Sequence, residues 1–304
     1  MGIVFEQVLI LFIFVAIGFI LGRTKLVDTR HSQMLSKLLV YVFLPCNNIK
    51  AFSSNCTPQY LKENYILVLI GFAVLFVLML VMHFLAKPLT KKKYDRYVYE
   101  YSMIVPNYGF MGYALAESFF GEIGLLNFIM FSLAYAFYIY TIAFAKLTKS
   151  GFTPKKLATN PALISIAIGL ILGLTQLPIP SVVQSVLSKS SSCMAPVSMI
   201  LAGLVISEFN LKEIMKRWAI YPVTFVRLLG VPILAGVILK ILGADETIVQ
   251  TVVLFTALPC GMNTIVFPKL VNEDCRAGAG LAVVSTVLAC ATIPVVISYI
   301  FNLV

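Results

Sequence analysis

Long apolar stretches dominate the chain, and they constrain its fold more than any other feature. Ten of them fall at 3–22, 34–52, 65–86, 98–118, 124–145, 161–177, 185–206, 218–241, 247–268 and 277–302. A helix needs roughly 20 apolar residues to cross a bilayer. With 60% hydrophobic and 12% charged residues, the chain also leaves no room for a separate water-soluble domain. We therefore predict an all-α membrane protein of ten transmembrane helices.

The basic residues alternate between the loops that join these stretches. Of the 23 Lys and Arg residues, 18 lie in or at the edges of odd-numbered loops. Cytoplasmic loops carry an excess of Lys and Arg. The pattern predicts a multi-pass protein of the plasma (inner) membrane with both termini extracellular or periplasmic. It also explains the net charge of +10 without a nucleic-acid partner.

The two halves of the chain resemble each other. Ala16–Leu26 reads AIGFILGRTKL and Ala167–Leu177 reads AIGLILGLTQL, so eight of eleven positions match at an offset of 151. Two proline pairs keep nearly the same register: Pro45 with Pro196 at an offset of 151, and Pro106 with Pro259 at 153. Five spans are an odd number, so the second copy must enter the membrane upside down. We predict two inverted five-helix repeats, residues 1–155 and 156–304, an arrangement typical of secondary transporters.

Two spans carry helix-breaking residues at their middles. The fourth span has Pro106, Asn107, Tyr108 and Gly109, and the ninth has Pro259, Gly261 and Asn263. Proline removes an amide donor, and glycine adds backbone freedom. Unwound backbone within a membrane is tolerated only inside protein or beside a wet cavity. We therefore predict two broken helices that form the substrate site, with Asn107 and Asn263 as the leading residues and helix N-termini suited to an anion.

Other polar residues lie within or at the ends of spans. Arg227 is the one basic residue near the centre of a span, where a charge is costly. It either binds an anion or acts as a structural counter-ion, or else it snorkels or pairs with a carboxylate such as Glu117 or Glu100. Glu100 is the candidate for proton coupling, and otherwise an interfacial residue. A further group either lines the cavity or simply ends the second span: Pro45, Asn47 and Asn48.

The residues that many enzymes require are scarce. The chain has two histidines and six cysteines, with no CxxC pair, so we predict no metal site and no cofactor. No nucleophile–base set appears within the spans, which argues against a membrane-embedded enzyme. A secondary transporter is the leading interpretation. A channel or a receptor-like membrane protein remains the alternative, and the coupling ion is either a proton or absent.

Three segments are similar to the auxin efflux carrier family in its compact prokaryotic form: PNYGFMGYAL from Pro106, LPCGMNTIVF from Leu258 and APVSMILAGL from Ala195. The resemblance implies the fold of bile-acid/sodium symporters, with crossover helices at spans four and nine. It further implies a scaffold domain (1–53 and 161–208), a transport domain (60–150 and 212–304), an elevator-like motion, a homodimer and a small organic anion, auxin-like or another carboxylate, as substrate. The ninth-span break has no acidic residue, so a sodium site of the symporter type is not expected.

Overall fold

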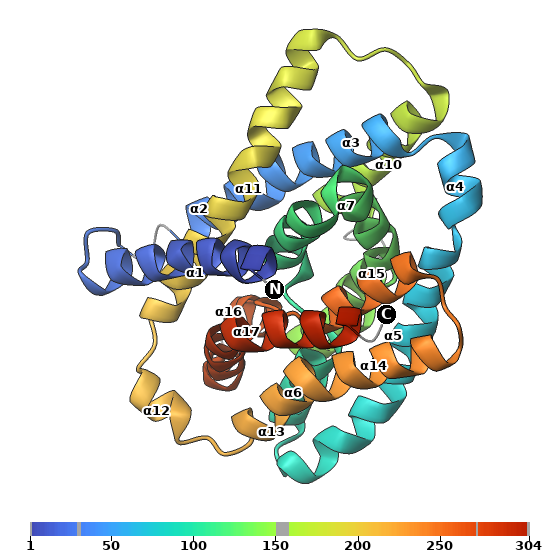
Figure 1. Ribbon diagram of the computed structural model, residues 1–304. Coiled ribbons are helices and arrows are strands. Elements are labelled where there is room, and N and C mark those ends of the chain that lie inside the picture. Colours follow the sequence, from blue (N-terminus) through green and yellow to red (C-terminus); the bar gives the residue numbers. More distant parts are fainter. Residues whose placement is uncertain (1, 29–31, 150–157, 272, 303–304) are drawn as a thin grey trace.

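The computed structural model describes residues 2–28, 32–149, 158–271 and 273–302. Within them the regular structure is helical, without a strand beyond one isolated β-bridge (Figure 1). Five helical segments are long and apolar enough to cross a membrane: Pro58–Leu89, Tyr108–Thr148, Ser181–Ser207, Ile220–Ile241 and Arg276–Tyr299. The all-α membrane class is confirmed, and ten spans stay a prediction. The predicted boundary between the repeats, at residues 155 and 156, lies outside the described residues.

The first half of the chain folds into a series of helices with short irregular turns between them. They are α1 (Gly2–Arg23), α2 (Ser32–Leu38), α3 (Leu44–Asn55), α4 (Pro58–Asn64), α5 (Ile66–Ala86), α6 (Lys93–Ile104), α7 (Tyr113–Tyr138) and α8 (Phe144–Thr148). One-turn π-helical segments, η2 (Leu39–Phe43), η4 (Tyr108–Gly112) and η5 (Ile139–Ala143), join several of them. The fourth and fifth predicted spans share α7, which turns at Gly121 with a φ of 69° that favours glycine.

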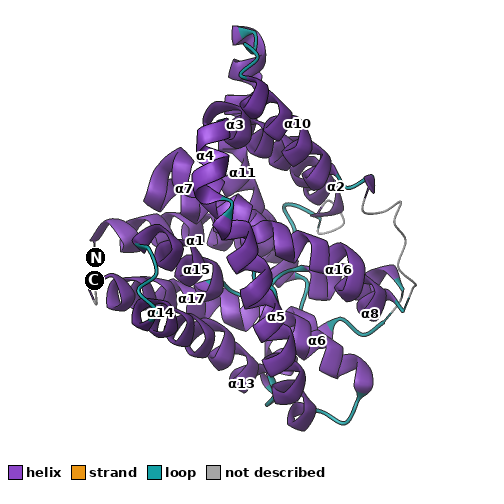
Figure 2. Ribbon diagram, turned by 90° about the vertical axis from the view of Figure 1, so that its right-hand side faces the viewer, coloured by secondary structure: helices purple, strands orange, loops and turns teal. Residues whose placement is uncertain are grey.

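The second half repeats this order of elements. It comprises α10 (Pro161–Thr175), α11 (Ser181–Ser207), α12 (Leu211–Met215), α13 (Ile220–Phe225), η6 (Val226–Gly230), α14 (Val231–Ile241), α15 (Glu246–Ala257), α16 (Asn263–Leu270) and α17 (Arg276–Asn302). Figure 2 shows that α1 begins and α17 ends on the same side of the molecule. That arrangement agrees with both termini facing one compartment, and which compartment that is stays a prediction.

The repeated sequence motif has a packing role that is the same in both halves. Helix α1 lies along α11, and α10 lies along α3 (Figure 1). A Cβ added at Gly18 would come under 3.0 Å from the carbonyl oxygen of Ile200, and one at Gly173 equally close to that of Phe52. Small residues let membrane helices approach closely, where dispersion rather than water exclusion holds them together. Each repeat therefore packs its first helix on the second helix of the other repeat.

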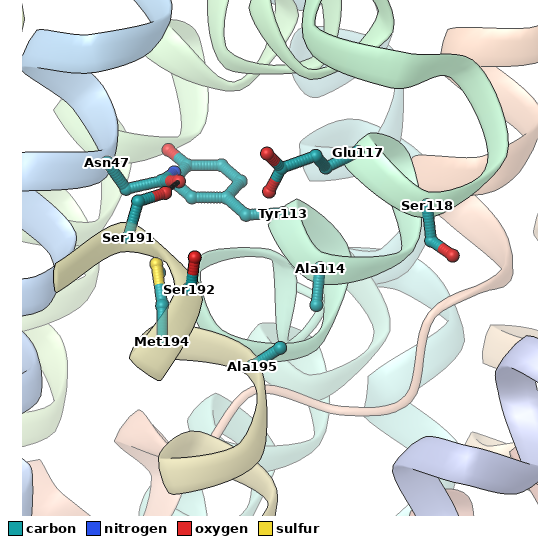
Figure 3. A pocket seen from close by; sticks show the side chains of 9 residues that line it. All are labelled: Asn47, Tyr113, Ala114, Glu117, Ser118, Ser191, Ser192, Met194 and Ala195. Carbon is teal, nitrogen blue, oxygen red and sulfur yellow. Dashed lines mark hydrogen bonds between the residues drawn. The ribbon is translucent and has the colours of Figure 1, made fainter. Parts of the chain in front are cut away.

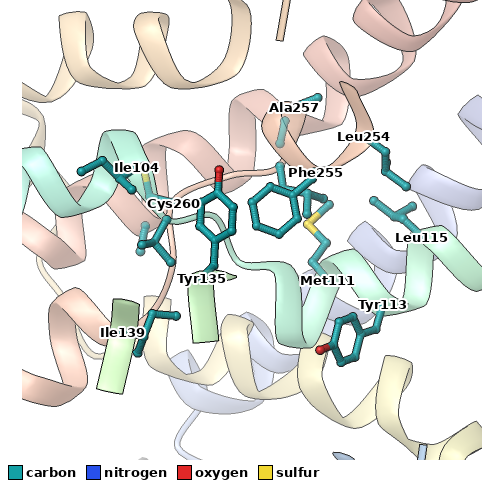
Figure 4. Close-up of a cluster of buried hydrophobic side chains, with 14 of the residues drawn as sticks. Ile104, Met111, Tyr113, Leu115, Tyr135, Ile139, Leu254, Phe255, Ala257 and Cys260 are labelled. Carbon is teal, nitrogen blue, oxygen red and sulfur yellow. The ribbon is translucent and has the colours of Figure 1, made fainter. Parts of the chain in front are cut away.

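A cluster of buried aromatic side chains lies beside the ends of α6 and α15. Phe255 of α15 is fully buried, and its ring centroid lies 4.3 Å from that of Tyr135 and 4.9 Å from that of Phe131 (Figure 4). Tyr108 stacks on the same ring at 5.5 Å. Such aromatic contacts stabilise the packing by about 0.5–1.5 kcal/mol each. They fix the ends of α15 and η4 against α7.

Candidate functional site

The helices are interrupted within the predicted fourth and ninth spans, near Pro106 and Pro259, and the two interruptions lie against each other. Helix α6 ends at Ile104 and α15 ends at Ala257. The amide of Asn107 donates to the carbonyl oxygen of Pro259 at 2.8 Å, and the amide of Gly261 donates to that of Val105 at 3.1 Å. We call residues 105–107 and 258–262 the paired breaks. Their backbone groups satisfy one another inside the protein, as irregular backbone within a membrane must.

The close approach of the two breaks favours a glycine at position 261. A Cβ at Gly261 would lie 3.1 Å from the carbonyl oxygen of Pro106. Gly109, in contrast, has only the Cδ1 of Leu44 within 4 Å of such an added atom, at 3.8 Å. Gly261 therefore allows the two backbone segments to pair, whereas Gly109 leaves space between η4 and α3.

The helices that restart after the paired breaks have open N-termini. Neither Asn107 before η4 nor Met262 before α16 makes a side-chain capping hydrogen bond. The first amides of a helix have no partner within it, and a helix N-terminus carries about half a positive charge. Two such ends next to the paired breaks favour a negatively charged or acceptor-rich ligand.

Arg227 lies in the π-helical turn η6 and holds the two helices that end at the paired breaks. It is 0% exposed. Its Nη1 donates to the carbonyl oxygens of Met103 at 3.1 Å and Ile104 at 3.4 Å, at the end of α6. Its Nε and Nη2 donate to those of Leu258 and Phe255, both at 3.0 Å, at the end of α15.

Two of the expectations for Arg227 are therefore wrong. It does not snorkel, because its side chain is completely buried. It does not pair with Glu117 or Glu100 either, because their closest cations are Lys50 and Lys146 respectively. Two helix C-termini together carry roughly one negative charge, which balances the guanidinium. This balance leaves the positive N-termini of η4 and α16 without compensation.

The predicted asparagines lie at the start of the restarted helices. The side chain of Asn107 is buried, with 6% exposed. Asn263 is half-buried, and its Nδ2 donates to the hydroxyl of Tyr101 on α6 at 3.0 Å. The crossing thus gathers Pro106, Asn107, Tyr108, Gly109, Pro259, Gly261 and Asn263, with Arg227 behind them.

A large cavity adjoins the paired breaks at Met262, and a small cavity lies at the start of α7. The small cavity, of about 170 Å³, is lined by Asn47, Tyr113, Ala114, Glu117, Ser118, Ser191, Ser192, Met194 and Ala195 (Figure 3). The large cavity, of about 500 Å³, lies among α2, α11, η4 and α16, and its lining includes Lys37, Phe110, Ser198, Glu208, Met262 and Ile265. Ser198 of α11 lines the large cavity, and its hydroxyl donates to the carbonyl oxygen of Phe110 at 3.3 Å.

The residues predicted at the end of the second span separate into different environments. Asn47 lines the small cavity, and its Oδ1 accepts from Ser191 at 2.6 Å. Asn48 turns the other way and donates to the hydroxyl of Ser165 on α10 at 3.0 Å, which makes it a packing residue. Pro45 occupies the first turn of α3. The structure thus brings only Asn47 of these three to one of the two cavities.

Glu100 forms a charged cluster of its own, away from both cavities. The carboxylate is 3% exposed, and Lys146 donates to its Oε1 at 3.1 Å. The Nδ1 of His83 lies 3.6 Å from Oε2, which has no hydrogen-bond partner among the described residues. A role of Glu100 in proton coupling stays a prediction.

The sequence did not lead us to predict some of the cavity residues, above all Ser191 and Ser198 on α11 and Tyr113 on α7. A spacing of seven residues places the two serines on one helix face, and that periodicity was the available signal. Among the described residues, no three His, Cys, Asp or Glu side chains converge in a way that would hold a metal ion.

The helical membrane architecture and the internal duplication define a membrane transport protein. A family model described as "Membrane transport protein" matches residues 3–153 and again residues 147–297. The chain belongs to this family, which includes the auxin efflux carriers, and each match covers one of the two repeats. An uncharacterized transporter of Methanocaldococcus jannaschii is 25% identical over 293 residues, which cover 92% of this chain and 94% of the relative.

Proposed function

We propose that the protein is a secondary carrier for a small organic anion, with the paired breaks as the crossover of two helices in a ten-span fold. The observation that carries the proposal is the electrostatics of the paired breaks. Arg227 balances two helix C-termini, while two uncapped N-termini remain beside cavities. A solute with a carboxylate would find unpaired amides and a favourable field there.

The position of the cavities supports an elevator-like motion. Both lie between the set of helices expected to form the scaffold (1–53 and 161–208) and the set expected to form the transport domain (60–150 and 212–304). The scaffold contributes α2, α3 and α11, and the transport domain contributes η4, α7 and α16. Movement of one set past the other would join the binding site to each cavity in turn. By the charge pattern of the loops, the large cavity faces the cytoplasm and the small one faces outside.

Counterflow in proteoliposomes tests the proposal. Vesicles preloaded with benzoate or indole-3-acetate should accumulate the labelled acid, because a carrier exchanges solute whereas a channel only equilibrates it. Asn107→Ala and Asn263→Ala should each lower the rate about tenfold or more. Asn64→Ala is the matched control, because the side chain of Asn64 donates within α4, to the carbonyl oxygen of Tyr60 at 3.0 Å.

Normal exchange in both mutants would place the site elsewhere. Uptake without stimulation by internal solute would favour a channel.

A further inference from the structure

One face of α11 lines three cavities in succession. Its residues are spaced alternately by four and three: Gln184, Ser188, Ser191, Ala195, Ser198 and Ala202. Residues with this spacing lie on the same side of a helix. Gln184 and Ser188 line a third cavity of about 340 Å³, Ser191 and Ala195 line the small cavity, and Ser198 and Ala202 line the large cavity.

The length of this face matches the thickness of a membrane. From position 184 to position 202 an α-helix rises about 27 Å, at about 1.5 Å per residue. The hydrocarbon core of a bilayer is about 30 Å thick. A hydroxyl or amide group therefore lies within two turns of any point along the face. The side chains are small, so they leave space for a solute next to the helix.

An independent feature marks a binding position on this face. Asn47 of α3 is 2% exposed and lines the small cavity next to Ser191 (Figure 3). Because its Oδ1 already accepts from Ser191, the side-chain amide has a fixed orientation. Its Nδ2 has no hydrogen-bond partner in the part of the chain that the structure describes. A buried donor without a partner costs about 1–3 kcal/mol, which a ligand acceptor would recover.

We infer that this face of α11 is the fixed wall of the solute path, and that Asn47 Nδ2 forms a holding site for a carboxylate or carbonyl oxygen in the small cavity. The inference rests on the proposed carrier function and assigns its route. Lys50 pairs with both acidic groups near this cavity, with Glu117 at 3.4 Å and Glu122 at 2.9 Å, so it reduces their repulsion of an anion. The Ser198–Phe110 contact then closes the route between the small and large cavities.

Thiol labelling tests the route without knowledge of the natural solute. Cysteine replaces Ser188, Ser191 or Ser198 in a Cys193→Ser background. The purified protein reacts with anionic MTSES or cationic MTSET, and peptide mass spectrometry reads the rates. Each site should react about tenfold or more faster than Val186→Cys, the matched control. Val186 is 55% exposed, but it lies on another, apolar side of α11 that detergent covers, where a thiol does not ionise, whereas the cavities admit water. Wall positions as slow as this control would overturn the route.

The holding site has its own readout in the same experiment. Asn47→Ala should lower the ratio of the MTSES rate to the MTSET rate about fivefold at Ala195→Cys, which lines the same cavity and keeps the Ser191–Asn47 hydrogen bond, because it removes one hydrogen bond to an anion. The ratio at Ser188→Cys should stay constant. An unchanged ratio at Ala195→Cys would overturn the holding site. Labelling does not depend on counterflow, so a failure of the carrier proposal shows in the exchange assay alone.

Discussion

Replacement of Arg227 by methionine probes how the two broken helices are held together. Methionine fills a similar volume, but it removes a buried charge and four hydrogen bonds to carbonyl oxygens. Each carbonyl left without a partner costs about 1–3 kcal/mol unless the helix end rearranges. Loss of one member of a buried charge arrangement usually destabilises a protein by about 3–5 kcal/mol. We therefore expect Arg227→Met to lower the free energy of unfolding by about 3–5 kcal/mol.

The effect should appear as a shift of the unfolding temperature in detergent. At about 2–4 °C per kcal/mol for a chain of this size, Arg227→Met should melt about 10 °C below the wild type. The exposure of the buried Cys260 thiol to a fluorogenic maleimide reports the transition, because Cys260 lies in the paired breaks and is 0% exposed. Arg227→Lys keeps the charge but loses the planar guanidinium group, so its melting temperature should lie between those of the wild type and Arg227→Met.

Arg217→Met is the matched control. Arg217 pairs with Asp274 at 3.2 Å in a partly exposed ion pair, so its loss should cost less than about 1 kcal/mol. We estimate that loss of the hydrogen bonds must shift the melting temperature by more than about 2 °C. A smaller shift in Arg227→Met would refute the structural role of Arg227. A stable variant that has lost only its affinity for anions would make Arg227 a direct ligand instead.

Two further predictions concern the helix packing and the loop before α17. Gly18→Val should prevent α1 from lying on α11, so that size-exclusion chromatography shows no folded, monodisperse protein. Gly230→Val is the control and should elute normally, because no atom lies within 4 Å of a Cβ added there. Equal elution of the two variants would contradict the packing. Hydrogen bonds from Arg276 lower the pKa of Asp274 to about 2. The carboxylate therefore stabilises the fold by about 1 kcal/mol near neutral pH, after allowance for solvent screening, and this is lost as pH falls from about 4 to about 2. The melting difference between wild type and Asp274→Asn should shrink over that interval, and a constant difference would contradict it.

The sequence predicted the features that arise from local chemistry. Pro106 and Pro259 each remove an amide donor, and a glycine follows each within three residues, so the combination predicted both breaks. Proline alone would not have done so, because Pro196 and Pro294 lie inside continuous helices. The glycines at 18 and 169 showed the duplication because both repeats need the same close helix contact. The breaks also explain why α6, α15 and α16 are too short to appear as spanning helices, although each belongs to a long apolar stretch.

Features that depend on contacts between distant segments could not be predicted. The sequence marked Arg227 as costly, but its partners are backbone carbonyls, which every residue carries and no pattern identifies. Asn47 and Asn48 are adjacent and chemically identical, and only helix packing turns one toward a cavity and the other toward α10. The serines of α11 could have been found by their spacing, but their importance depends on which helices face them.

A density map of the protein in lipid nanodiscs would test the central claim most directly. The account predicts that the fourth and ninth spans lose helical winding at residues 105–107 and 258–262. It also predicts that the amide of Asn107 lies within hydrogen-bonding distance of the carbonyl oxygen of Pro259, at 2.8 Å here. Two continuous helices separated by other spans would contradict it.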